Sequence, residues 1–197
     1  MLTPHPSVQR NRDPIAKVIQ GVLPGEGLVL EIGSGSGAHA AWFAPRLPGV
    51  SWQPTDGEPA SLPIISQWAA QSGATNILPP LHLDATAQDW PVERAAAMVC
   101  INMIHISPWQ VTLGLLAGAG RVLPSGGVLY LYGPFRINGQ QTAPSNVQFE
   151  GWLKGLDPRF GVRDLGEVTE VAAGHGLRLT ERRAMPANNF SVVFQRD

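Results

Sequence analysis

The chain has 197 residues, of which 15% are charged, and its formal net charge is −1 at pH 7. That length is enough for one domain with a full core, which we expect over residues 1–197. The charged fraction is below the roughly 25% of an average soluble domain, and no basic block occurs in the sequence. Binding to nucleic acid is therefore not expected, and a small-molecule substrate is favoured.

The cysteine content and the N-terminal residues indicate a reducing compartment. The single cysteine, Cys100, lies in an apolar run and excludes an internal disulfide. No pair of Cys or His residues has the spacing of metal ligands, so no metal is expected. The N-terminus is polar, unlike a signal peptide, and no apolar run approaches the roughly 20 residues of a membrane span. We expect a cytoplasmic monomer or homodimer without membrane contact.

The first half of the chain alternates between strand and helix patterns, which is typical of a parallel sheet covered on both faces. Asp13 and Pro14 predict the N-cap and first turn of a short helix. After a strand and a glycine loop, a second helix is expected to end at Pro48–Gly49. The predicted strands of this half are Leu28 to Ile32, Val50 to Thr55 and Leu81 to Leu83, with a helix through residues 64–69 closed by Gly73.

The second half begins with the apolar run from Ala96 to Ile104, which predicts a central parallel strand. Ser107 and Pro108 predict the N-cap and first residue of the next helix, which extends to Leu123. A strand over residues 128–132, an irregular stretch over 133–144 and helices over 147–156 and 165–173 follow. The last two strands, 177–182 and 190–195, have no helix between them and must pair antiparallel. The predicted fold class is α/β and Rossmann-like, with a mostly parallel sheet and a terminal antiparallel hairpin.

Alternating glycines after the first strand are the main functional motif. Glycine lets a backbone turn tightly and approach a ligand closely. The spacing of Gly33, Gly35 and Ala38 also satisfies the dinucleotide fingerprint, so the loop alone leaves two nucleotide cofactors open. Glu31 favours the cationic S-adenosylmethionine over a pyrophosphate. The predicted cofactor contacts of this segment are Glu31, Gly33, Ser34, Gly35 and Gly37.

Two further acids follow predicted strands. Asp56 lies 21 residues after Gly35, where an acid accepts hydrogen bonds from both ribose hydroxyls of either cofactor. Asp84 and Ala85 are candidate adenine contacts. Each acid has a structural alternative: Asp56 and Asp84 as turn or cap residues, and Glu31 as a solvated strand end. The terminal hairpin, in place of a crossover helix, again favours S-adenosylmethionine.

Motifs along the whole chain resemble those of the methyltransferase-like 26 family of class I S-adenosylmethionine-dependent methyltransferases. The resemblance implies a seven-stranded methyltransferase fold and this cofactor. The matching segments are Arg10 to Ile15, Glu31 to His39, Trp52 to Asp56, Ile101 to Trp109, Tyr132 to Phe135, Pro144 to Asn146, Gly161 to Asp164 and Met185 to Asn189.

The reacting end of the site is expected at the carboxyl ends of the fourth and fifth strands. Asn102 occupies the place where amino-directed methyltransferases carry Asn or Asp before Pro-Pro and an aromatic residue. The different residues that follow it here put nucleobase or glutamine-amide methylation in doubt, and Asn102 is expected to border the methionine moiety. His105 is the first candidate for a general base, or else a packed histidine. Tyr132 is a second candidate, to orient or deprotonate a hydroxyl, or else a core aromatic.

Polar residues outside the strands complete the predicted site. Arg10 and Asn11 are expected before the first helix and across the cofactor, where Arg10 pairs with the methionine carboxylate or stays solvated. A polar substrate pocket is predicted from residues of the irregular stretch and the last hairpin loop, although turn formation explains the asparagines of that loop nearly as well. These substrate candidates are Arg136, Asn146, Arg163, Asn188 and Asn189.

The leading hypothesis is a methyltransferase acting on O, N or S of a small molecule. The alternatives are a nicotinamide-dependent reductase using the same loop and a non-catalytic S-adenosylmethionine-binding protein, because a fold does not imply a function.

Overall fold

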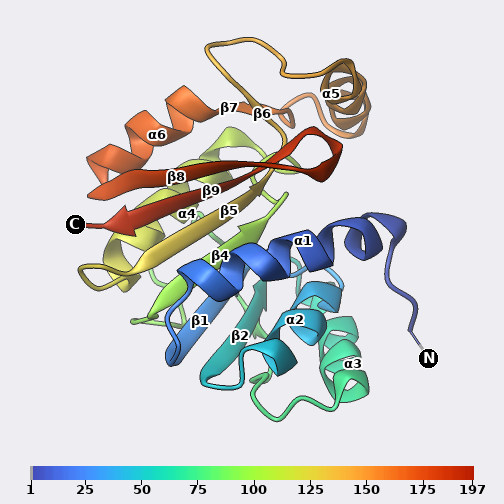
Figure 1. Ribbon diagram of the computed structural model, residues 1–197, viewed down its shortest axis with the longest axis vertical. Helices are drawn as coiled ribbons and strands as arrows, with labels where there is room; N and C mark the ends of the chain where they lie inside the picture. Colours follow the sequence, from blue (N-terminus) through green and yellow to red (C-terminus); the bar gives the residue numbers. More distant parts are fainter. Residues whose placement is uncertain (1) are drawn as a thin grey trace.

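The computed structural model describes residues 2–197 and contains one seven-stranded sheet in the order β3-β2-β1-β4-β5-β9-β8 (Figure 1). The first five strands run parallel, whereas β9 pairs antiparallel with β5 and with β8. The strands are β1 (Gly27–Ile32), β2 (Val50–Asp56), β3 (Leu81–His82), β4 (Ala97–Ile101), β5 (Val128–Gly133), β8 (Leu177–Met185) and β9 (Asn189–Arg196). The predicted arrangement of five parallel strands closed by an antiparallel hairpin is confirmed.

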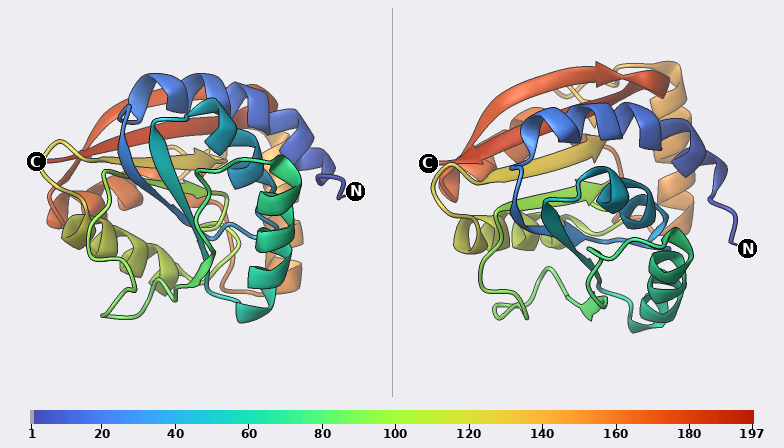
Figure 2. Two further views of the ribbon diagram at one scale, coloured as in Figure 1. Left: turned by 90° about the horizontal axis from the view of Figure 1, so that it is seen from below. Right: turned by 60° about the horizontal axis from the view of Figure 1, so that its bottom comes forward.

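Helices cover both faces of this sheet, as Figure 2 shows. On one face α1 (Pro6–Val22) and α2 (Ala38–Phe43) enclose a core around Trp52, with α3 (Leu62–Ser72) beside α2. On the other face α4 (Trp109–Val122) and α6 (Leu165–Gly174) pack on alternate residues of the same strands, such as Leu30. The burial of β4 on both faces explains why its sequence is a continuous apolar run, whereas β1 carries one acid, Glu31, in its buried part.

The first helix begins earlier than predicted. α1 starts at Pro6, where the His5 side chain accepts a hydrogen bond from the Ser7 N–H, and Pro14 lies inside the helix. The expected start at Asp13–Pro14 is therefore wrong. An interior proline costs a backbone hydrogen bond, but the buried residues Val8, Asn11 and Ile15 keep helical spacing across it and the burial offsets that cost. Arg10 and Asn11 consequently lie in the helix and not before it.

The fourth strand ends earlier than predicted. β4 stops at Ile101 because Asn102 adopts a left-handed conformation with φ 61°, which breaks a strand. The expected strand end at Ile104 is wrong, since Ile104 is buried in a turn and not in the sheet. The expected Ser107 N-cap is also wrong: Pro108 is the N-cap, and Ser107 Oγ donates to the Met103 carbonyl at 2.8 Å.

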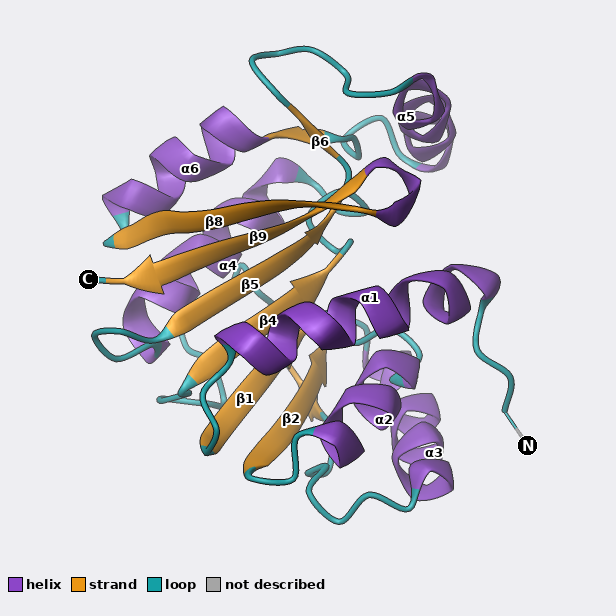
Figure 3. Cartoon of the chain, viewed as in Figure 1, coloured by secondary structure: helices purple, strands orange, loops and turns teal. Residues whose placement is uncertain are grey.

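The stretch expected to be irregular contains a short strand, β6 (Phe135–Arg136), which pairs parallel with β7 (Arg163–Asp164) in a separate two-stranded sheet (Figure 3). The next helix, α5 (Pro144–Leu156), begins three residues before its predicted start at Val147. It lies beyond the carboxyl ends of β4 and β5 (Figure 1). The remaining elements are the 3-10 turns η1 (Ala44–Arg46), η2 (Pro59–Ser61) and η3 (Pro186–Asn188). Within residues 2–197, no helix has both the length and the apolarity that crossing a membrane requires.

Candidate active site

A cavity of about 620 Å³ opens at the carboxyl ends of β4 and β5, the edge at which open α/β sheets bind ligands. The start of α1, the helix α5 and the turn between β8 and β9 form its other walls. The structure brings together six of the predicted site residues here. The lining residues are His5, Ser7, Arg10, Asn11, Asn102, Ile106, Tyr132, Pro134, Ser145, Asn146, Phe149, Trp152, Pro186, Ala187 and Asn189.

The three loop glycines have positive φ angles of 71°, 58° and 82°, but they differ in their surroundings. A Cβ on Gly33 would lie 2.6 Å from Met103 Cγ, and one on Gly37 would lie 2.8 Å from Ile65 Cα. A Cβ on Gly35 would meet no atom within 4 Å. Gly33 and Gly37 therefore satisfy packing within the protein, whereas Gly35 exposes backbone to open space that a ligand could enter.

Glu31 is a buried acid beneath this loop. Its Oε2 accepts hydrogen bonds from Ser34 Oγ at 2.9 Å and from Trp52 Nε1 at 3.0 Å. Burial nevertheless raises the pKa of Glu31 to about 7, because the two hydrogen bonds only partly offset the loss of water. The interpretation of Glu31 as a solvated strand end is excluded by its exposure of 2%.

Glu31→Gln is expected to stabilise the protein at about pH 8 and to leave it nearly unchanged at about pH 4. The carboxyl group ionises near 4.5 in the unfolded chain but at about 7 when folded, so wild-type stability falls as pH rises through this window. The loss approaches about 3 kcal/mol. The amide oxygen of glutamine can accept both existing hydrogen bonds without carrying a charge. Urea unfolding across the window checks this, and parallel pH profiles for the two proteins would contradict it.

The acids after β2 and β3 both accept hydrogen bonds from backbone N–H groups of nearby loops. Asp56 Oδ2 accepts from the Gly35 N–H at 2.7 Å and its Oδ1 accepts from the Glu58 N–H at 2.9 Å. Asp84 Oδ1 accepts from the Thr86 N–H and hydroxyl, both at 2.8 Å, and these bonds hold the pKa of Asp84 below its usual range. Asp56 thus links the glycine loop to the end of β2, and Asp84 forms a turn.

Arg10 and Asn11 of α1 and Tyr132 of β5 lie in the wall of the cavity. Asn11 Oδ1 lies 2.9 Å from His39 Nε2. Burial, and then the charge of Arg12, lower the pKa of His39 to about 4, so the ring is neutral at pH 7. Burial raises the pKa of Tyr132 to about 12, although a hydrogen bond with Asn11 acts in the opposite direction. Tyr132 therefore offers a protonated hydroxyl at neutral pH.

His105 does not line the cavity. The ring is fully buried with its edge against Phe135, at a centroid distance of 4.9 Å. Its Nδ1 accepts from the Arg163 N–H at 3.2 Å, and its Nε2 lies so close to Gly133 that a Cβ there would be 2.5 Å away. Burial, and then the charge of Arg163, lower the pKa of His105 to about 3. The imidazole is thus a neutral packing group behind the cavity wall and does not reach a ligand in the cavity as a general base.

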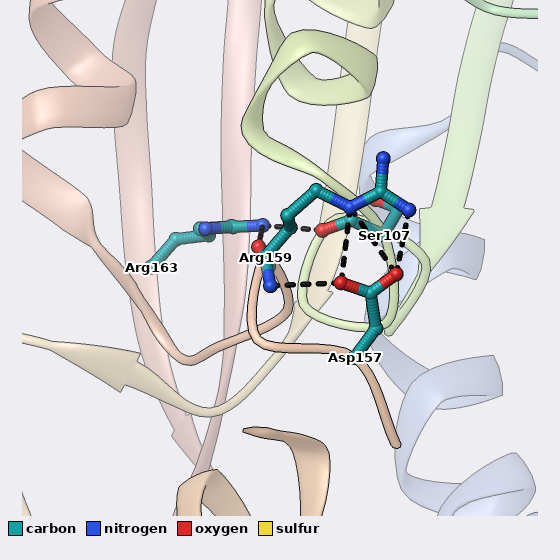
Figure 4. A network of polar contacts seen from close by, with 4 residues as sticks. All are labelled: Ser107, Asp157, Arg159 and Arg163. Carbon is teal, nitrogen blue, oxygen red and sulfur yellow. Dashed lines mark hydrogen bonds and ion pairs between the residues drawn. The ribbon is translucent and has the colours of Figure 1, made fainter. Parts of the chain in front are cut away.

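Arg163 also lies outside the cavity, where it holds the loop after β4 (Figure 4). Its Nε donates to the Ile104 carbonyl at 2.8 Å, and its Nη2 donates to the Ser107 carbonyl and, at 3.2 Å, to the Arg159 carbonyl. The adjacent Arg159 side chain pairs with Asp157 at the surface. Arg163 therefore connects the segment after α5 to the turn that follows β4.

The other predicted substrate residues divide into two groups. Asn146 and Asn189 line the cavity, whereas Arg136 and Asn188 do not. Asn146 Nδ2 donates to the Asn188 carbonyl at 3.1 Å, and Asn188 Nδ2 donates to Ser145 Oγ at 3.0 Å. Asn188 thus acts in the hairpin turn, with φ 59°, and joins that turn to α5.

The sequence prediction missed the aromatic wall on α5 and the cap residue of α1. Phe149 and Trp152 stack with their centroids 5.7 Å apart, and Trp152 is 56% exposed. Their spacing of three residues on a predicted helix is a signal in the sequence that the two rings share one face. His5 was missed because α1 was expected to begin after it.

The fold is that of class I S-adenosylmethionine-dependent methyltransferases, as comparison with solved structures shows. An O-methyltransferase family protein from Burkholderia thailandensis superposes with a TM-score of 0.84 over 97% of this chain and 57% of its own, at 14% identity. The S-adenosylmethionine-dependent methyltransferase SibL gives 0.78, with 96% and 55% coverage at 17% identity. CalO1, a methyltransferase in calicheamicin biosynthesis in its SAH-bound form, gives 0.76, with 95% and 53% coverage at 17% identity. This chain spans little more than half the length of these three proteins.

The family is shown by sequence. Residues 3–196 match the family model described as "Protein of unknown function (DUF938)", and the chain belongs to this DUF938 family.

Proposed function

We propose that this protein is an S-adenosylmethionine-dependent methyltransferase acting on a small molecule. The observation that carries the proposal is the loop after β1, where the open Gly35 backbone lies between a buried acid, Glu31, and the Asp56 carboxylate bonded to it. The proposal has four further parts. The chain is a member of the methyltransferase-like 26 family and forms one domain over residues 1–197. It is located in the cytoplasm, and its partner is a small molecule and not a nucleic acid.

The charge of Glu31 favours a cationic cofactor. Because its pKa is about 7, the ionised and protonated forms of Glu31 are about equally populated at neutral pH, and a bound ligand can shift the balance between them. A nearby ammonium or sulfonium group favours the ionised carboxylate, whereas a pyrophosphate disfavours it. The two phosphates of a nicotinamide dinucleotide in this loop would therefore repel the ionised form of Glu31.

Most of the predicted cofactor residues have an assigned contact in the proposed complex. The Gly33 to Gly37 loop would approach the methionine side, with Asn102 and Arg10 at the cavity end, where Arg10 pairs with the carboxylate. Asp56 would accept from the ribose hydroxyls, and Asp84 with Ala85 would contact adenine. The bound cofactor supplies an activated methyl group. The residues of this chain orient it toward the cavity, which is the main requirement of a direct displacement.

Asp56→Ala is expected to weaken S-adenosylhomocysteine binding by about 30-fold or more, because it removes a charged hydrogen-bond acceptor from both the ribose and the Gly35 N–H. Isothermal titration calorimetry with S-adenosylhomocysteine measures the change. The control is Asp157→Ala, which removes a carboxylate that pairs with Arg159 and makes no bond to the glycine loop. Binding of NADH in place of S-adenosylhomocysteine by the wild-type protein would refute the proposal and favour a reductase. Cofactor binding without transfer to any acceptor would indicate a non-catalytic binding protein.

A further inference from the structure

The cavity next to the proposed cofactor loop has an unusual set of titratable groups. Among the residues that line it within the described chain, only His5, Arg10 and Tyr132 titrate, and no Asp, Glu, Lys or Cys is present. The first two come from α1 and its cap, and the third from β5. The walls formed by α5, by the loop after β4 and by the hairpin turn contribute no ionisable side chain to the lining. A positively charged ligand would find no counter-charge there.

None of these three groups presents a free base to the cavity. The His5 Nδ1 accepts from the Ser7 N–H at 3.3 Å and lies 2.7 Å from Ser7 Oγ. Its lone pair is therefore engaged by Ser7, and Nε2 carries a proton and offers a donor. Burial keeps Tyr132 protonated by raising its pKa to about 12. The Arg10 guanidinium is a permanent cation and has no acceptor atom. An acceptor bound here receives hydrogen bonds and positive potential, but nothing on the cavity wall takes its proton.

The remaining walls define the shape and polarity of the ligand. Phe149 and Trp152 stack at 21° to one another on α5, and Ile106 and Pro134 add apolar surface. Such surfaces bind planar, apolar groups.

The side-chain amides of Asn146 and Asn189 can offer a ligand only their oxygen atoms, because their nitrogens already donate within the protein. Asn146 Nδ2 donates to Thr142 Oγ1 and to the Asn188 carbonyl, both at 3.1 Å. Asn189 Nδ2 donates to the Pro186 and Ala187 carbonyls, both also at 3.1 Å. The carbonyl oxygens of these amides remain as hydrogen-bond acceptors, which match O–H or N–H donors on a ligand.

We propose that the methyl acceptor is a hydroxylated aromatic molecule without a cationic group, and that it loses its own proton to water before transfer. This inference rests on the proposed function. In the transfer step the phenolate oxygen forms a bond to the methyl carbon while the carbon–sulfur bond of the sulfonium breaks and its electron pair stays on sulfur. No oxidant and no enzyme base is required, and the phenolate charge is favoured by the His5 donor.

Ligand binding tests the acceptor class separately from catalysis. With S-adenosylhomocysteine bound, calorimetric titrations with 4-ethylphenol, 3-(4-hydroxyphenyl)propionate and tyramine compare a neutral, an anionic and a cationic phenol of similar size. The first two are expected to bind at least about tenfold more tightly than tyramine. Trp152→Ala is expected to weaken their binding by about tenfold or more, whereas Leu156→Ala, which removes an equally exposed α5 side chain outside the cavity, leaves it unchanged.

The pH dependence of methyl transfer tests whether the protein supplies a general base for the acceptor. For 4-nitrophenol, 4-cyanophenol and phenol, which become less acidic in that order, kcat/KM is expected to rise with pH and to level off at a pH that follows the acidity of each acceptor. An inflection that stays at one pH for all three would show an enzyme base and overturn the inference. Failure of every phenol to bind while S-adenosylhomocysteine binds would also overturn it and leave the proposed function standing. Failure of S-adenosylhomocysteine to bind would overturn the proposed function itself.

Discussion

Gly35→Ala is expected to weaken S-adenosylhomocysteine binding by about 100-fold or more while costing only about 1 kcal/mol of folding stability. The residue has φ 58°, and a Cβ there meets no protein atom within 4 Å, so the stability cost is that of a left-handed alanine alone. The same Cβ would project into the space above the loop, where the proposed cofactor must approach the backbone. Calorimetric titration and urea unfolding of the same variant measure the two effects.

Two other glycines provide controls for this variant. Gly73, at the end of α3, has φ 68° and equally open surroundings, so Gly73→Ala is expected to lose the same stability with unchanged binding. Gly37→Ala is expected to lose more stability than either, because its Cβ would lie 2.8 Å from the Ile65 backbone. Equal S-adenosylhomocysteine affinities for the Gly35 and Gly73 variants would show that the loop does not hold the cofactor.

Arg163→Ala is expected to lower the free energy of unfolding by about 2–4 kcal/mol, because it removes charged hydrogen bonds to several carbonyls at once. Its guanidinium group donates to the carbonyls of Ile104, Ser107 and Arg159. The loss also loosens the turn that follows Asn102 at the cavity, so acceptor binding is expected to weaken more than cofactor binding. Urea unfolding and separate titrations with S-adenosylhomocysteine and 4-ethylphenol check both parts.

The neighbouring arginine is the matched control (Figure 4). Arg159→Ala breaks only the exposed ion pair with Asp157 and leaves its own carbonyl available to Arg163, so no measurable change in stability is expected. Comparable stability losses in the two variants would rule out Arg163 as the connection between the α5 segment and the loop after β4.

The fold could be predicted because its signals are local. The apolar runs of β1 and β4, the glycine loop and the two consecutive strands at the end each follow from neighbouring residues. The errors arose where tertiary contacts override local preference. Pro14 predicts a helix start on its own, but burial of Val8 and Asn11 extends α1 past it. Ile104 continues an apolar run, but the left-handed Asn102 had already ended the strand.

The candidate site could be predicted only in part for the same reason. The carboxyl ends of parallel strands meet at one edge, and Asn102 and Tyr132 therefore line the same cavity. The position of α5 depends on contacts between segments that are far apart in the chain, such as the hydrogen bond between Asn146 and Asn188. Local sequence patterns do not predict contacts of this kind. His105 was favoured for its chemistry, although burial removes it from the cavity.

A crystal structure of the protein with S-adenosylhomocysteine tests the central claim most directly. We predict ligand density over Gly33 to Gly37, with the ribose at Asp56, the adenine toward Asp84 and the sulfur facing the cavity between Tyr132 and α5. Density for the ligand elsewhere on the protein, or a loop that remains empty at saturating ligand, would contradict the account.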